Sequence, residues 1–138
     1  MASPRPSLNY GSTAAGTNNT FNLDGGTLTI RRVVTGNNSG RARFNFNGGL
    51  LRANGPIASL VDLGGADQLV NIRDGGARID TDGYDVTLPE ALRHSDVEGD
   101  AAIDGGLTKL GAGTLTLTAA STYTGDTAVE AGRLNVTT

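Results

Sequence analysis

The 138-residue chain contains no cysteine and no tryptophan. Without cysteine, disulfide bonds and thiolate metal sites are excluded. Aromatic residues make up only 4% of the chain, and charged residues make up 18%, against roughly one quarter charged in ordinary soluble domains. Apolar residues still account for 37%. The chain is therefore long enough and apolar enough to bury a core, and it is not a disordered polar segment.

Long hydrophobic runs are also missing. No apolar stretch approaches the roughly 20 residues of a membrane-spanning helix, and no apolar segment follows Met1 as it would in a secretion signal. The chain as it stands is expected to carry neither a signal nor a membrane anchor. Its net charge is −3, and its cations are ten Arg and the single Lys109. This acidic balance argues against a nucleic-acid partner, which requires a basic face.

Glycine is abundant, with 21 residues, but it has no three-residue period, which excludes collagen. Apolar and polar residues alternate with a period of two, which is typical of strands, and the sequence predicts an all-β fold. The one helix-like candidate, residues 88–94, is a single turn at most. The alternation predicts one continuous core made of Phe21, Leu23, Leu28, Ile30, Phe44, Phe46, Leu50, Val70, Ile72, Ile79, Leu115, Leu117, Leu134 and Val136.

Gly-Gly pairs recur between the alternating segments, and Asp or Asn precedes four of the five pairs. The exception is Gly64–Gly65. We expect one glycine of each of the four Asx-Gly-Gly triplets to take a positive φ, and the Asp or Asn side chain to bond a turn amide. The residues predicted to form these structural turns are Asp24, Gly25, Gly26, Asn47, Gly48, Gly49, Asp74, Gly75, Gly76, Asp104, Gly105 and Gly106.

Two all-β arrangements fit strands separated by recurring Gly-Gly turns, namely a meander of β-hairpins and a parallel β-helix. Residues 21–28 align with residues 44–51 at a spacing of 48 − 25 = 23 residues. A meander would need a turn about every 8–12 residues, whereas 23 residues suit one coil of a three-sided solenoid. The spacing favours the β-solenoid. It predicts up to about six short coils, stacked to a height of about 29 Å.

Residues 105–136 read GGLTKLGAGTLTLTAASTYTGDTAVEAGRLNV. This segment resembles the autotransporter-associated β-strand repeat of bacterial autotransporter passengers. The family pattern is roughly GG-L-x-K-x-G-x-G-T-L-x-L-x-G-x-N-x-Y-x-G-x-T-x-V-x-x-G-x-L-x-V. The segment departs from it at Ala119–Ala120, where Gly is common, and at Ser121, where Asn is common. The resemblance implies a right-handed parallel β-helix that is exported to the bacterial cell surface or beyond it. It also implies a repeat that assists passenger folding and transport and is not catalytic.

These observations divide the chain into three parts. Residues 1–20 are expected to form a flexible N-terminal arm or cap. Residues 21–104 are expected to form irregular solenoid coils, and residues 105–138 the repeat.

Candidate chemistry is sparse. The only histidine stands in His94-Ser95-Asp96, which is expected to be a solvent loop, because neighbours in sequence rarely face one another as a triad must. The carboxylates of Asp80, Asp82 and Asp85 are a calcium alternative that lacks the later bidentate Glu, so an Asp-rich turn is the favoured interpretation. No catalytic residue, cofactor or metal site is predicted, and the chain is not expected to be an enzyme.

The sequence therefore predicts a structural extracellular or cell-surface module, acting as stalk, scaffold or self-assembling subunit. The alternative is a carbohydrate-binding or carbohydrate-active β-helix, although few aromatic residues are available as sugar platforms. A solenoid ends in open strands. The segment Arg133, Leu134, Asn135 and Val136 is expected to pair end to end with another copy or with further repeats, giving homo-oligomers or a filament. No membrane insertion by this segment is expected.

Overall fold

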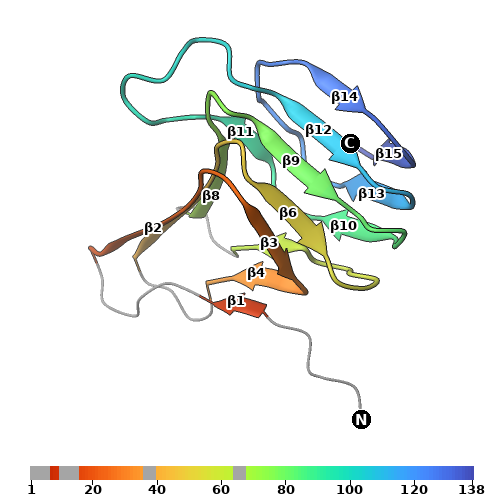
Figure 1. The fold of residues 1–138 in the computed structure, drawn as a ribbon. Coiled ribbons are helices and arrows are strands. Elements are labelled where there is room, and N and C mark those ends of the chain that lie inside the picture. The colour runs from red at the N-terminus through yellow and green to blue at the C-terminus, as the bar shows by residue number, and fades with distance from the viewer. Residues whose placement is uncertain (1–6, 10–15, 36–39, 64–67) are drawn as a thin grey trace.

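The computed structural model describes residues 7–9, 16–35, 40–63 and 68–138, and these residues form strands and turns without a helix (Figure 1). The helix-like interpretation of residues 88–94 was wrong. This segment contains the end of one strand and the whole of another, joined by residues 89–91 with a bend at Glu90. Within the described residues, there is no helix with the length and hydrophobicity that crossing a bilayer requires.

The strands gather into four sheets, and every strand pairing is parallel. The first sheet contains β1 (Ser7–Asn9), β4 (Arg32–Val34) and β7 (Val61–Asp62). The second contains β2 (Asn18–Leu23), β5 (Arg41–Phe46), β8 (Gln68–Ile72) and β11 (Leu92–His94). The third contains β3 (Thr27–Ile30), β6 (Leu50–Ala53), β9 (Ala77–Asp80), β12 (Leu107–Leu110) and β14 (Thr127–Val129). The fourth contains β10 (Val86–Leu88), β13 (Thr114–Leu117) and β15 (Arg133–Val136).

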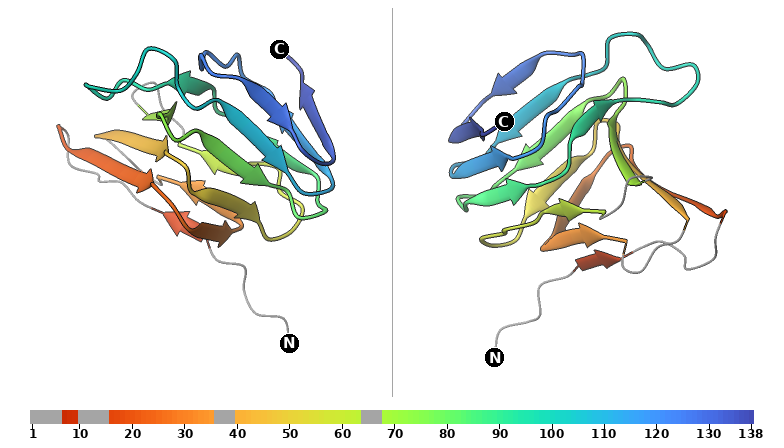
Figure 2. Two further views of the ribbon diagram at one scale, coloured as in Figure 1. Left: turned by 45° about the horizontal axis from the view of Figure 1, so that its top comes forward. Right: turned by 180° about the vertical axis from the view of Figure 1, so that it is seen from behind.

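As far as β13 the chain passes from sheet to sheet in a repeating order, as the stacked ribbons of Figure 2 show, and β14 and β15 then add strands to the third and fourth sheets only. β1, β2 and β3 lie in the first, second and third sheets, and β4 returns to the first, where it pairs with β1. A bridge between Ile57 and Val86 links the region of β7 to β10. The all-parallel pairing excludes the hairpin meander, whose neighbouring strands would be antiparallel. The arrangement is that of a β-solenoid.

The internal alignment seen in the sequence is the observed strand register. Phe21 pairs with Phe44, and Leu28 pairs with Leu51. The Phe21 and Phe44 rings stack with centroids 5.4 Å apart, and Phe46 meets Phe44 edge to face at 5.0 Å. Paired strands lie between 133 − 114 = 19 and 107 − 77 = 30 residues apart. Coils of unequal length therefore still bring like residues into one column.

Most of the predicted core is confirmed. Nine of its members are buried, namely Leu23, Ile30, Phe44, Phe46, Val70, Ile72, Ile79, Leu115 and Leu117, while Phe21, Leu28 and Leu134 are partly buried against the cluster. One assignment was wrong, and one predicted core residue lies on the inward side but is exposed. In β6 the inward positions are Leu51 and Ala53, so Leu50 lies on the outward side and is only partly buried. Val136 is 57% exposed, because no strand of the described chain stacks on β15.

The segment predicted as an arm, residues 1–20, includes strand residues. Ser7–Asn9 pairs with β4, and β2 begins at Asn18. Residues 1–6 and 10–15 lie outside the described residues, so most of that prediction falls there.

Candidate functional site

The four Asx-Gly-Gly triplets all lie at the corner between the second and third sheets. We call this stack of four turns the corner column. Backbone hydrogen bonds join its successive turns, from Gly48 N to Gly76 O (2.9 Å) and from Ala77 N to Gly106 O (2.8 Å). The expected positive φ occurs once in each triplet, at Gly26 (68°), Gly48 (97°), Gly76 (82°) and Gly106 (72°). The fifth pair, Gly64–Gly65, lies outside the described residues.

The Asp and Asn side chains of these corners play different roles. Asp104 Oδ1 accepts a hydrogen bond from Gly106 N at 2.9 Å, as expected for a bond within its own turn. Asn47 also bonds a turn amide, but in the next coil, whereas Asp74 bonds an amide outside the four turns, and Asp24 Oδ1 accepts from the side-chain Nδ2 of Asn47 at 3.2 Å. Asn47 Oδ1 accepts from Gly75 N at 2.8 Å in the next coil, and Asp74 Oδ1 accepts from Ala101 N at 3.0 Å. These two side chains therefore join separate segments of the chain.

Asp104 is the most heavily bonded carboxylate of the described chain, and its side chain is fully buried. It accepts backbone hydrogen bonds from Thr124 (2.8 Å) and Gly125 (2.8 Å), and it contacts Nδ1 of His94 at 2.9 Å. Burial alone would raise the pKa of Asp104, but the hydrogen bonds from Thr124, His94, Gly125 and Gly106 bring it down to about 2. The ionised carboxylate thus joins β11 to the turn before β14.

The expectation that His94 lies in a solvent loop was wrong. His94 belongs to β11, and its Nδ1 contacts Asp104 and the hydroxyl of Thr124 (3.1 Å). The neighbouring Ser95 donates to Asp100 at 2.6 Å, and Asp96 instead pairs with Arg43 at 3.2 Å. Since the three side chains turn to different partners, they do not assemble a nucleophile with its base.

The calcium alternative is not assembled either. Asp80 Oδ2 pairs with Arg52 at 3.1 Å, while its Oδ1 accepts from Asp82 N at 2.8 Å. Asp82 takes a left-handed φ of 50°. Asp80, Asp82 and Asp85 do not converge, and over residues 7–9, 16–35, 40–63 and 68–138 no group of three His, Cys, Asp or Glu side chains gathers as a metal site would require.

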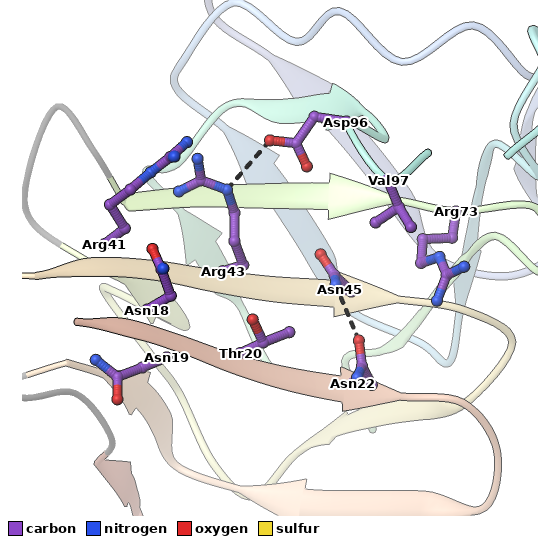
Figure 3. A pocket seen from close by; sticks show the side chains of 10 residues that line it. All are labelled: Asn18, Asn19, Thr20, Asn22, Arg41, Arg43, Asn45, Arg73, Asp96 and Val97. Carbon is purple, nitrogen blue, oxygen red and sulfur yellow. Dashed lines mark hydrogen bonds and ion pairs between the residues drawn. The ribbon is translucent and has the colours of Figure 1, made fainter. Parts of the chain in front are cut away.

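A polar groove of about 520 Å³ lies on the outer face of β2 and β5, and sequence reasoning missed it (Figure 3). Its lining residues are Asn18, Asn19, Thr20, Asn22, Arg41, Arg43, Asn45, Arg73, Asp96 and Val97. Asp96 and Val97 belong to the loop between β11 and β12. This loop is far from β5 in the sequence, since the contacting residues Arg43 and Asp96 are 96 − 43 = 53 residues apart. Only the alternating Asn and Arg of β2 and β5 could have indicated this face.

The loop is held to the second sheet by ion pairs. Arg73 contacts both carboxylate oxygens of Asp100, at 2.8 and 2.9 Å, which is a bidentate geometry. The hydrogen bond from Arg73, and then that from Ser95, lowers the pKa of Asp100 to about 2. Asp96 Oδ1 accepts from Asn71 Nδ2 at 2.8 Å, beside the contact of its other oxygen with Arg43. The groove wall is therefore fixed in place.

Comparison with known families concerns the C-terminal part of the chain. The family model of the passenger-associated-transport-repeat matches residues 107–136, which span β12 to β15. This segment is an autotransporter passenger repeat. The repeat implies an autotransporter passenger module, and with it a secreted or cell-surface location. No curated protein and no solved structure matches the chain significantly.

The passenger repeat contains a fully buried Lys109. Its Nζ donates to the carbonyl oxygens of Leu110 (2.8 Å), Gly111 (2.6 Å) and Ala131 (3.1 Å). Burial lowers the pKa of Lys109, and the charge of Asp80 opposes that effect. The ammonium group thus satisfies three carbonyls from two successive coils. The Lys of the repeat pattern was visible in the sequence, but its inward direction was not.

The passenger repeat also forms one end of the described stack. β14 and β15 are the last strands of the third and fourth sheets, and within the described residues nothing pairs with their far edges. Val129 pairs with the inward Lys109 and Val136 with the inward Leu117, yet they are 47% and 57% exposed. They lie on the core side of their strands but lack a covering layer. The predicted assembly residues Arg133, Leu134, Asn135 and Val136 make up β15.

Proposed function

We propose that the chain is a structural, non-catalytic segment of an autotransporter passenger, exported to the cell surface or beyond it. In this role it is a right-handed β-solenoid of up to about six coils, serving as a stalk, scaffold or self-assembling subunit. Right-handed crossovers between parallel strands are the general rule. The observation that carries the proposal is the continuation of parallel ladders from the upstream coils into the passenger repeat.

The direction of the backbone groups in β15 supports stacking of a further strand. Arg133 N donates to Gly113 O at 3.0 Å, and Thr137 N donates to Leu117 O at 3.1 Å. Amides alternate in direction along a strand, so those of Leu134 and Val136 point to the open edge. A strand added there would cover Val136, and a full coil that also adds a strand to β14 would cover Val129. We propose that the first coil of another copy, or a further repeat, supplies that strand.

The test compares Val136→Pro with the matched control Val136→Ala. Proline removes one outward amide at a position where an edge strand tolerates it, whereas alanine keeps the amide. We expect light scattering across a concentration series to show oligomers for the wild-type chain and Val136→Ala. The Val136→Pro variant should assemble at least ten times more weakly. Electron microscopy of the same samples should show linear particles.

A wild-type chain that stays monomeric at every concentration would contradict the assembly proposal. Equal assembly by Val136→Pro and Val136→Ala would contradict the part of it that assigns the contact to β15. Far-UV circular dichroism of each variant checks that the β structure is retained.

A further inference from the structure

The groove on the outer face of β2 and β5 has a charge opposite to that of the whole chain. Its lining residues include Arg41, Arg43 and Arg73. Asp96 pairs with Arg43 and Asp100 with Arg73, so Arg41 gives the groove its excess positive charge, whereas the net charge of the protein is −3. A basic, solvent-open groove on an acidic protein is not required by strand stacking, because stacking depends on the inward side chains and the backbone. The structural role alone thus does not explain the charge of this groove, which is instead suited to binding an anionic ligand.

An asparagine ladder gives the groove a defined hydrogen-bonding direction. Asn71 Nδ2 donates to Asn45 Oδ1 at 3.1 Å, and Asn45 Nδ2 donates to Asn22 Oδ1 at 2.9 Å. The carboxylate of Asp96 sets this order, because it can only accept and so requires the Nδ2 group of Asn71 beside it. Asn45 and Asn71 are buried, but Asn22 is exposed. The ladder thus ends at Asn22, which lines the groove and whose Nδ2 donor the ladder does not use.

Two arginines add cationic donors to the same groove. Arg41 and Arg43 are two residues apart on β5, so their side chains project from the same face, as Figure 3 shows. Arg43 is held by Asp96 at 3.2 Å and by the carbonyl of Ala42 at 3.1 Å, while Arg41 is exposed. One guanidinium is fixed beside the loop, and the other is accessible to solvent next to it.

We propose that this groove binds an acidic oligosaccharide, a chain of sugars carrying carboxylate or sulfate groups. The arginines pair with the anionic groups, and the Asn and Thr side chains bond the sugar hydroxyls. Six-residue strands give the groove a length of about 20 Å, which suits an extended polymer. None of the lining residues is aromatic. The stacking platforms on which single-stranded nucleic acid depends are therefore lacking, and a sugar chain is held here by ion pairs and hydrogen bonds rather than by stacking.

The experiment titrates the full chain, by calorimetry, with a hexagalacturonate and with a sulfated heparin-derived hexasaccharide. The neutral hexasaccharide of cellulose and an oligoglutamate peptide of equal charge serve as comparison ligands. We expect saturable binding of at least one acidic saccharide, at least tenfold tighter than either comparison ligand. Binding to the hexagalacturonate alone would identify carboxylates as the recognised groups, and binding to the heparin fragment alone would identify sulfates.

Three variants locate the site. Arg41→Gln removes the accessible guanidinium. Asn22→Asp keeps an oxygen that accepts from Asn45 but replaces the Nδ2 donor of Asn22 by a second acceptor. Each variant should weaken saccharide binding at least tenfold. Arg78→Gln, at an exposed position of β9 on another sheet, is the matched control and should leave binding unchanged. Absence of binding at millimolar acidic saccharide would overturn the proposal. Equal weakening by Arg78→Gln, or tighter binding of oligoglutamate, would overturn it as well.

Discussion

A few buried ionised side chains join separate segments of this solenoid through hydrogen bonds and ion pairs. Asp104 is the clearest case. Its folded pKa of about 2 lies below the ordinary value of 3.8, so its ionised form stabilises the fold at pH values above about 4. That stabilisation, roughly 2 kcal/mol, is lost as the pH falls from about 4 towards 2. Asp100 has a pKa of about 2 for a different reason, its Arg73 pair, and acts in the same window.

We predict that Asp104→Asn lowers the free energy of unfolding at pH 7 and flattens its pH dependence between pH 4 and 2. The neutral amide cannot match the carboxylate as acceptor for the amides of Gly106, Thr124 and Gly125. Urea unfolding at several pH values measures both effects. A variant with the same pH dependence as the wild-type chain would count against this account.

Lys109 is the cationic counterpart inside the passenger repeat. Lys109→Met keeps most of the buried aliphatic volume but leaves the carbonyls of Gly111 and Ala131 without their side-chain donor, while the carbonyl of Leu110 keeps its bond from the amide of Thr81. Because an orphaned buried polar group costs about 1–3 kcal/mol and these two carbonyls are only partly buried, we expect a total loss of about 1–3 kcal/mol. Arg78→Met, on an exposed position of β9, is the control and should change stability little. Equal melting temperatures for the two variants would refute the role assigned to the ammonium group.

Among the elements, the corner column depends on closeness of approach as well as on backbone conformation. Gly76 and Gly83 have nearly the same positive φ, 82° and 86°. A Cβ at Gly76 would collide with the backbone of Gly105, whereas a Cβ at Gly83 meets nothing within 4 Å. The two positions therefore separate backbone strain from crowding between coils.

We predict that Gly83→Ala costs about 1 kcal/mol, the usual penalty for a side chain in the left-handed region. Gly76→Ala should cost clearly more, because the adjacent coil must also move. Thermal or urea unfolding of the pair provides the comparison. Equal losses would mean that the column has room for a side chain and that its glycines serve conformation alone.

The strands and corners were predictable because they rest on local signals. The alignment of residues 21–28 with 44–51 reproduces the observed register, since identical spacing of apolar residues forces like side chains into one column. The prediction failed where two apolar residues stood together, at Leu50 and Leu51, because period two alone does not say which one faces inward.

The groove and the polar cross-links could not be predicted in the same way. They depend on the loop after β11 folding back onto strands about fifty residues earlier, as in the contact of Arg43 with Asp96. The partners of His94 and Lys109 are likewise set by stacking of distant coils. A pattern within one strand carries no information about such neighbours, so their positions emerge only from the assembled fold.

At the scale of the whole molecule, the described chain is a row of coils in which each strand pairs only with strands of adjacent coils. Stability of such a row is approximately a sum over coils and their interfaces. The loop after β11 adds a second kind of link, because it binds two strands of the second sheet through Asp96 and Asp100. We expect this link to make unfolding of the central coils more cooperative than strand pairing alone would.

The uncovered inward face of β14 and β15 has a consequence for how such a fold scales with length. Each further coil placed there would bury Val129 and Val136 and expose an equivalent pair one step on. The free-energy cost of the two uncovered ends is thus constant, whereas the stabilisation from contacts between coils grows with every coil added. Long arrays of this passenger repeat are therefore favoured over short ones, and a threshold number of coils must exist below which the ends outweigh the interior.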